Sequence, residues 1–412
     1  MDPSPRTRQQ AVVRDAADPL SQWRDRFVIP DGVIYLDGNS LGPMPSHIPD
    51  RLGKVLVDEW ARGLIGSWND ADWIGLPQRT AAKIAPLIGA DPDEVMVADS
   101  TSVDLFKLLV IAARLRPDRR VIVVEPTTFP TDGYIATSVA RLLDLELRWC
   151  DPGDPLDAVG SDTAALALTH VDFRSGATYD LDLITEGAHA RGAAMIWDLC
   201  HSVGAIPVNM HACEADFAVG CTYKYLNGGP GSPAFMYAAR AHHERLDQPL
   251  TGWFGHAEPF AMERDYRPAL GTTSLAAGTP PIVAMAVLHS ALDVFDGVDL
   301  SALRAKSLAL TAMFLQLIDE RLPGTFAFAT PTDPARRGSQ VSLRHEHANG
   351  VVQALIKRGV VGDFRAPDIA RFGFAPLYLR FVDVYDAVAA LQTVMESREW
   401  ADPAFAERRA VT

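Results

Sequence analysis

Two residues with the chemistry of one cofactor site lie a strand–helix–strand unit apart in the sequence. Lys224 lies in the glycine-rich stretch Cys-Thr-Tyr-Lys-Tyr-Leu-Asn-Gly-Gly-Pro-Gly, and Asp198 ends the apolar run Ala-Met-Ile-Trp-Asp. A neutral lysine amine forms a Schiff base with an aldehyde, and a buried carboxylate keeps a pyridine nitrogen protonated. The pair therefore predicts a pyridoxal 5′-phosphate (PLP) site. Taken singly, Lys224 would be a loop lysine and Asp198 a turn or capping residue.

Further candidates for cofactor contact follow the ends of other apolar runs: Thr101, Ser102, Phe129, Asp132, Thr169 and His201. Thr101 and Ser102 open a predicted helix, whose N-terminus suits a phosphate, although simple capping explains these hydroxyls equally well. Phe129 offers a ring to stack on a pyridine, and Asp132 a second carboxylate. His201 follows Asp198 by three positions and is expected near the ring or the phosphate.

An amino-acid substrate needs a cation for its carboxylate, and arginine binds a carboxylate through two parallel N–H bonds. Arg371, in Arg-Phe-Gly-Phe-Ala-Pro-Leu-Tyr, is the candidate in the C-terminal part. Arg365 and Arg380 compete for this role on local grounds, and a surface ion pair of small worth is the alternative for each.

The sequence pattern around these residues indicates an α/β fold. Apolar runs at 95–98, 121–124, 165–168, 194–197, 217–219 and 234–237 alternate with helical patterns at 103–115, 134–143 and 181–191. Such alternation predicts a mostly parallel sheet covered on both faces, with ligands at the carboxyl ends of its strands. Beyond residue 280 the pattern predicts a smaller α+β domain. We expect an N-terminal segment (1–45), a large cofactor-binding domain (46–290) and a small C-terminal domain (291–412).

Composition narrows the class of partner. The 412 residues are 48% hydrophobic and 22% charged, with a net charge of −14, which argues against nucleic acid and anionic membranes as partners. The four cysteines make no CxxC pair and read as reduced core residues. With no apolar leader and no membrane-length run, we expect a cytoplasmic enzyme with a small-molecule substrate. No His/Cys/Asp spacing suggests a metal site.

The motifs together resemble the kynureninase family, and the likeness runs from about residue 20 to 396. It is carried by Gly-Asn-Ser-Leu-Gly at 38–42, Asp-Ser-Thr-Ser-Val-Asp-Leu-Phe at 99–106, Phe-Pro-Thr-Asp at 129–132, Trp-Asp-Leu-Cys-His at 197–201, the Lys224 stretch, Gly-Trp-Phe-Gly-His at 252–256, and Arg371 with Pro-Leu-Tyr at 376–378. Two positions depart from the pattern: Cys200 stands where a smaller residue is usual, and Asp172 stands where asparagine is usual.

The resemblance implies an aspartate-aminotransferase-like fold, a homodimer with active sites at the subunit interface, and hydrolysis of L-kynurenine to anthranilate and L-alanine. The resemblance also implies 3-hydroxykynurenine as a second substrate. Lys224 and Tyr223 would then move protons while Asp198 supports the ring. Tyr223 would also bind the phosphate, which Trp253 and Thr279 would reach from the neighbouring subunit. Ser40 and Arg371 would face the substrate, with Trp68 beside its aromatic ring.

Two other classes of function remain open from the sequence. A class V aminotransferase or a cysteine desulfurase would share the fold, but a desulfurase needs a reactive cysteine on a mobile loop, and the cysteines here lie in strand-like or cofactor-adjacent segments. A non-catalytic relative would have lost the polar set, which is intact.

Overall fold

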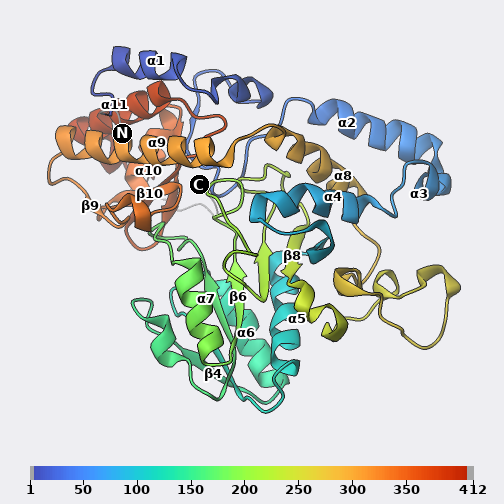
Figure 1. The fold of residues 1–412 in the computed structure, drawn as a ribbon. Helices are drawn as coiled ribbons and strands as arrows, with labels where there is room; N and C mark the ends of the chain where they lie inside the picture. Colours follow the sequence, from blue (N-terminus) through green and yellow to red (C-terminus); the bar gives the residue numbers. More distant parts are fainter. Residues whose placement is uncertain (1–3, 406–412) are drawn as a thin grey trace.

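A central sheet organises the lower part of the molecule in the computed structural model, which describes residues 4–405 (Figure 1). Its seven strands lie in the order β2-β8-β7-β6-β5-β3-β4. They are β2 (Val95–Ala98), β3 (Val121–Val124), β4 (Glu146–Trp149), β5 (Thr163–Thr169), β6 (Ala194–Asp198), β7 (Phe217–Gly220) and β8 (Ala234–Ala238). Strands β3 to β7 are mutually parallel, whereas β8 runs antiparallel to both of its neighbours. The mostly parallel sheet is therefore confirmed.

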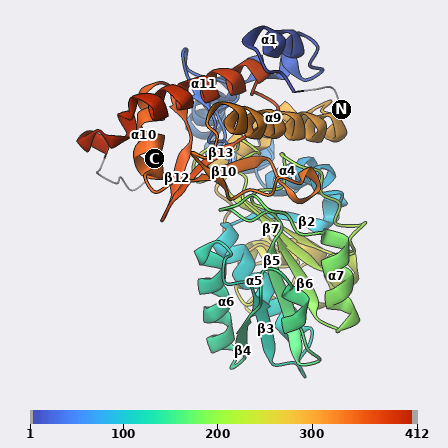
Figure 2. The same ribbon diagram turned by 90° about the vertical axis from the view of Figure 1, so that its left-hand side faces the viewer.

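Helices cover both faces of this sheet, which explains the continuous apolar runs. Helices α5 (Thr101–Arg114) and α6 (Pro130–Leu142) lie on one face and α7 (Leu181–Ala190) on the other (Figure 2). Side chains alternate between the faces of a strand. In β3, Ile122 and Val124 join the α5/α6 core, while Val121 and Val123 join the opposite one.

A second, four-stranded antiparallel sheet lies in the upper part of the molecule, in the order β12-β13-β10-β9. Its strands are β9 (Ala327–Phe328), β10 (Gln340–Arg344), β12 (Asp363–Arg365) and β13 (Ile369–Gly373). Helices α9 (Leu300–Arg321), α10 (Ala348–Lys357) and α11 (Phe381–Ser397) accompany it (Figure 2). This is the α+β part expected beyond residue 280.

The N-terminal segment joins this upper part. Helix α1 (Arg8–Ala16) packs on α11, and β1 (Ile34–Tyr35) pairs in parallel with β11 (Val360–Val361). The boundaries at residues 45 and 290 stay a prediction. After the loop that follows β1, the chain forms α2 (Ile48–Lys54) and then a π-helical stretch, Val55–Arg62. Within residues 4–405, no helix has the length and apolar character to cross a membrane.

Candidate active site

The carboxyl edge of the parallel strands opens into a cavity of about 310 Å³. Strands that run the same way end at the same edge, so residues far apart in the sequence meet there. The cavity is lined by Asn39, Ser40, Thr101, Ser102, Phe129, Thr131, Asp132, Thr169, Phe173, Asp198, Cys200, His201, Tyr223, Lys224, Arg365 and Arg371. Most of the residues predicted from the sequence are thus brought together in one place.

Lys224 lies just beyond β7, with its amine inside the cavity. Its Nζ is 3.3 Å from Nε2 of His201 and 5.9 Å from the centre of the Tyr223 ring. Burial, reinforced by the positive charges of Lys224, Arg371 and Arg365, lowers the pKa of His201 well below its usual range. Burial raises the pKa of Tyr223 above its ordinary 10, so its phenol keeps its proton and can donate it.

Asp198, at the end of β6, faces a second carboxyl group. Burial raises the pKa of Asp132 well above its usual range, and the neighbouring charge of Asp198 raises it further. Oδ2 of Asp132 accepts from Oγ1 of Thr128 (3.0 Å) and more distantly from Oγ1 of Thr169 (3.5 Å). Oδ1 of Asp198 accepts from the backbone N–H of Cys200 (2.7 Å). Two buried carboxyls side by side repel unless a proton or a cation lies between them.

The surroundings fit PLP. A protonated pyridine nitrogen is the kind of cation that the Asp132–Asp198 pair lacks. The N-terminus of α5 borders the cavity at Thr101 and Ser102, and its N-cap, Ser100, makes no capping bond with its side chain. Uncapped backbone N–H groups at a helix N-terminus attract a phosphate. The Phe129 ring is 43% exposed at the cavity, a suitable position for stacking on a flat ring.

A second polar group at the cavity wall is built around Asp363 on β12. This carboxylate accepts from Nε of Arg371 (2.8 Å), Nη2 of Arg365 (2.6 Å) and Oγ of Ser40 (2.8 Å). Asp363 and Arg371 are directly opposite one another in the antiparallel β12–β13 pair. Ser40 reaches them from the loop after β1, so this group of residues ties the N-terminal segment to the upper sheet.

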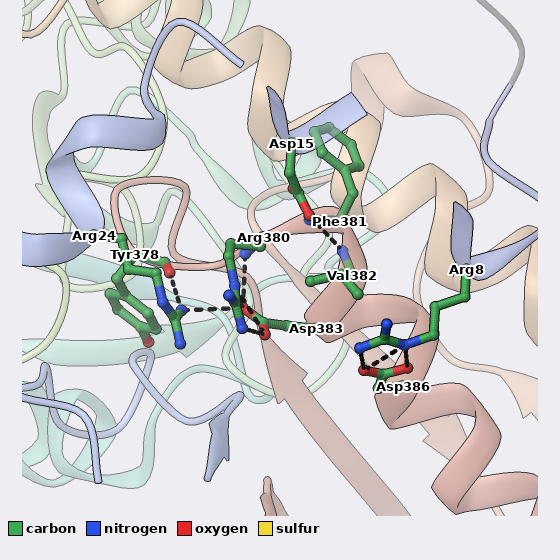
Figure 3. Close-up of polar contacts among 9 residues, drawn as sticks. All are labelled: Arg8, Asp15, Arg24, Tyr378, Arg380, Phe381, Val382, Asp383 and Asp386. Atoms are coloured by element: carbon green, nitrogen blue, oxygen red, sulfur yellow. Dashed lines mark hydrogen bonds and ion pairs between the residues drawn. The ribbon is translucent and has the colours of Figure 1, made fainter. Parts of the chain in front are cut away.

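Arg380, the third candidate for the carboxylate, has a different role. It is the N-cap of α11, and its guanidinium binds Asp383 in the first turn at 2.7 Å (Figure 3). Nη1 of Arg24 binds the same carboxylate at 3.0 Å. Arg380 does not line the 310 Å³ cavity. The Arg24–Asp383 bond joins the N-terminal segment to α11.

Three predicted site residues lie outside this cavity within the chain. Trp68 packs against Trp73 and Phe254, with ring centres 5.8 and 5.9 Å apart. Trp253 contacts the Phe254 ring at 4.5 Å, and Thr279 is exposed. None of these three residues lines the cavity that holds Lys224.

The two positions that depart from the family pattern differ in their surroundings. Cys200 lines the cavity, where its Sγ lies 3.9 Å from Oγ1 of Thr101 and accepts from the N–H of Cys221 at 3.1 Å. Asp172 lies outside this cavity and instead caps its own turn, accepting from the N–H groups of Arg174 and Ser175. All four cysteines are buried and unpaired.

One group of residues has the spacing of metal ligands, which the sequence did not suggest. Ligand atoms of Asp91, Glu94 and His211 lie within 4.8 Å of one another. His211 already pairs with Glu94, and Asp91 binds the Arg240 guanidinium at 2.7 Å. These contacts make it an ion-pair cluster, and none of its three residues lines the cavity.

The sequence missed several residues of the cavity wall and its support, namely Asn39, Thr128, Thr131, Phe173 and Asp363. Asn39 lies inside the Gly-Asn-Ser-Leu-Gly motif at 38–42, so this turn motif could have identified it as a residue of the cavity wall. Asp363 is part of an ordinary strand pattern, and only the pairing of β12 with β13 places it against Arg371.

Solved structures with the same architecture are enzymes. A cysteine desulfurase from Thermococcus onnurineus NA1 superposes with a TM-score of 0.79 at 18% identity, covering 91% of this chain and 98% of that one. The Escherichia coli cysteine desulfurase CsdA gives 0.77 at 18% identity, covering 92% and 98%. A C-DES mutant with glycine covalently linked to its PLP cofactor gives 0.77 at 16%, covering 90% and 98%. The chain therefore has the aspartate-aminotransferase-like fold that the sequence predicted.

Sequence relatives define the family. A kynureninase from Burkholderia mallei (strain SAVP1) is 49% identical over 415 residues, covering 99% of this chain and 100% of the relative. A kynureninase from Pseudomonas fluorescens is 46% identical over 414 residues, covering 98% and 100%. The family model "Kynureninase C-terminal domain" matches residues 303–391. The chain belongs to the kynureninase family.

Proposed function

We propose that this protein hydrolyses L-kynurenine to anthranilate and L-alanine by cleaving the Cβ–Cγ bond, with PLP as cofactor. The observation that carries this proposal is the 49% identity to a kynureninase along the whole chain, combined with Lys224 and Asp198 in one cavity. Acceptance of 3-hydroxy-L-kynurenine is part of the proposal.

When bound, PLP supplies an electron sink for charge that develops on the substrate α-carbon. Lys224 would hold the cofactor and, once released, carry the α-proton on Nζ. Asp198 would keep the ring nitrogen protonated, with Asp132 beside it and Phe129 stacked on the ring. Thr101, Ser102, Thr169, His201 and Tyr223 would make the remaining cofactor contacts within the subunit.

The residues around Lys224 are suited to proton transfer during hydrolysis. His201, kept neutral by burial, can share a proton with the Lys224 amine 3.3 Å away. Tyr223 keeps its phenolic proton and could donate it to Cβ, which takes the electron pair of the broken Cβ–Cγ bond, or to the oxygen of the γ-carbonyl. Ser40 and Arg371 are assigned to the substrate by family resemblance, and both line the cavity.

We also infer a homodimer in which each subunit completes the other's site. A groove of about 810 Å³ is lined by apolar residues such as Val28, Met44 and Val283. The segment of residues 253–270 extends from the body of the molecule at the right of Figure 1, with Met262 and Leu270 74% and 90% exposed. Apolar surface of this kind marks an interface.

In such a dimer Trp253 and Thr279 would reach the cofactor phosphate, and Trp68 the substrate ring, from across the interface. Hybrid dimers test this. Lys224→Ala and Trp253→Ala are each expected to be inactive, but mixed subunits should recover about a quarter of wild-type activity, because half of the dimers hold one intact site. No recovery would place Trp253 in its own subunit's site.

Anthranilate fluorescence tests the activity itself. The holoenzyme is incubated with L-kynurenine and 3-hydroxy-L-kynurenine side by side, with Lys224→Ala as the inactive control. Release of alanine from cysteine in place of anthranilate from kynurenine would favour a desulfurase, a reading that the four buried cysteines disfavour.

The same cysteines, unpaired throughout, support our inference of a cytoplasmic location.

A further inference from the structure

Cys200 and Cys221 lie side by side at the carboxyl edge of the central sheet. In the parallel pair of β6 and β7, Asp198 is opposite Val219, and the same register continued by two residues places Cys200 opposite Cys221. Residues two apart point to the same face of a sheet, and neighbouring strands lie about 4.8 Å apart. Because the α-carbons of a disulfide are about 4.4 to 6.8 Å apart, this pair has the spacing that a disulfide needs.

The two side chains also contact one another's backbone. Sγ of Cys200 accepts from the N–H of Cys221 at 3.1 Å, and Sγ of Cys221 donates to the carbonyl of Cys200 at 3.8 Å. Cys213, by contrast, donates to the carbonyl of Met210 at 3.6 Å. All four cysteines are free, and these contacts single out Cys200 and Cys221 as a pair.

The two thiols differ in access and in protonation. Cys200 lines the 310 Å³ cavity, so a solute as small as a peroxide can reach it, whereas Cys221 is 2% exposed. The interaction with Cys221, together with burial, raises the pKa of Cys200 well above its usual range. Burial opposes ionisation of Cys221, but the interaction with Cys200 and the charge of Lys224 lower its pKa overall. Cys221 is therefore the readier thiolate.

We propose that Cys200 and Cys221 form a redox modification site, which a peroxide oxidises to a disulfide that disables the cofactor site until a thiol reduces it. The Cys200 sulfur attacks one peroxide oxygen, the O–O bond breaks, and the departing hydroxide leaves as water with the thiol proton. The Cys221 sulfur then attacks the oxidised Cys200 sulfur, the S–O bond breaks, and a second water leaves with the Cys221 proton. The two thiols lose two electrons in total, and the peroxide accepts them.

The pair lies among the residues that would hold PLP. The N–H of Cys200 donates to Oδ1 of Asp198 at 2.7 Å, and Lys224 follows Cys221 by three positions. The sulfur atoms of a disulfide are about 2.05 Å apart, so bond formation moves Sγ of Cys200 away from the Cys221 N–H and shifts the ends of β6 and β7. A displacement of about 1 Å in such a site costs about 100-fold, so oxidation weakens the hold on PLP.

Peptide mapping and cofactor binding test the proposal together. The full-length protein is treated with hydrogen peroxide before PLP is added, alkylated, and digested without reduction by trypsin and a glutamate-specific protease. Cleavage after Arg191, Glu214 and Lys224 places Cys200 and Cys221 on separate peptides, 192–214 and 215–224, which we expect to find joined. A PLP titration followed by visible absorbance should show about 10- to 100-fold weaker binding after oxidation, and dithiothreitol should restore it.

Cysteine variants supply the controls. Cys200→Ala and Cys221→Ala should give no joined peptides, and peroxide should not change the PLP affinity of either variant. Cys213→Ala removes the other cysteine of the 192–214 peptide, which is likewise buried, and should respond as the wild type does.

Three results would overturn the proposal: no joined peptides from the oxidised wild type, joined peptides with unchanged PLP affinity, or an equal loss of affinity in Cys200→Ala. Neither readout uses a substrate. Failure of the proposed kynurenine hydrolysis would therefore appear only in the anthranilate assay.

Discussion

Replacing Asp37 with asparagine should stabilise the protein in a pH-dependent way. Burial raises the pKa of Asp37 from its ordinary 3.8 to about 7, and the charge of Asp363 contributes. Its Oδ1 is buried and has no hydrogen-bond partner within residues 4–405. The folded protein therefore keeps a proton here that the unfolded chain releases near pH 4.

The sign follows from linkage. Between about pH 4 and pH 7 the folded state binds the extra proton, so stability falls as pH rises and levels off above the folded pKa of about 7. Each tenfold change in proton affinity is worth about 1.4 kcal/mol, which places the full penalty near 4 kcal/mol. Asparagine has no charge to bury, so Asp37→Asn escapes this penalty.

Urea unfolding of the holoenzyme at pH 5, 6, 7 and 8 measures the effect. The stability gap between Asp37→Asn and the wild type should widen by about 2 to 3 kcal/mol from pH 5 to pH 8. Asp50→Asn, at an exposed position on α2, is the control and should change stability by less than about 0.5 kcal/mol at pH 8. A gap that stays constant with pH would refute the reasoning.

Three further substitutions test the packing beside the site and the docking of the N-terminal segment on α11. Gly373→Ala places a Cβ 2.1 Å from Oδ1 of buried Asn39, so it should destabilise by about 1 to 3 kcal/mol and reduce turnover; wild-type kinetics would contradict this. Asp383→Ala removes the acceptor shared by Arg24 and Arg380 (Figure 3) and should cost about 2 to 3 kcal/mol in urea unfolding, whereas an unchanged midpoint would show that these bonds contribute nothing. Arg8→Gln breaks an exposed pair with Asp386 and should leave the midpoint unchanged; a clear loss would mean that α1 docks through charge.

The parallel core of the fold was accessible from the sequence because strands buried on both faces are continuous apolar runs with turn residues between them. Strand β4 was missed because its sequence, Glu-Leu-Arg-Trp, mixes polar and apolar residues at the edge of the sheet. Strands β11 and β12 are short, and their partners are set by tertiary contacts.

The residues of the site also fall into a group that the sequence predicts and a group that it does not. Lys224 and Asp198 were predictable because each follows a parallel strand, and parallel strands end at one edge. The Asp363 group depends on the register of β12 against β13 and on a loop more than 300 residues away in the sequence, as the Ser40–Asp363 bond shows. No local pattern carries such a contact, and residues that would act across an interface depend on a second subunit.

The covalent attachment of the cofactor is the claim on which the account depends. Borohydride reduction of the holoenzyme, followed by trypsin digestion and peptide mapping, tests it directly. Reduced PLP should be found on the peptide spanning residues 192–240, because a modified Lys224 is no longer cleaved. A label on any other peptide, or no label on a protein that still releases anthranilate, would contradict the assignment of Lys224.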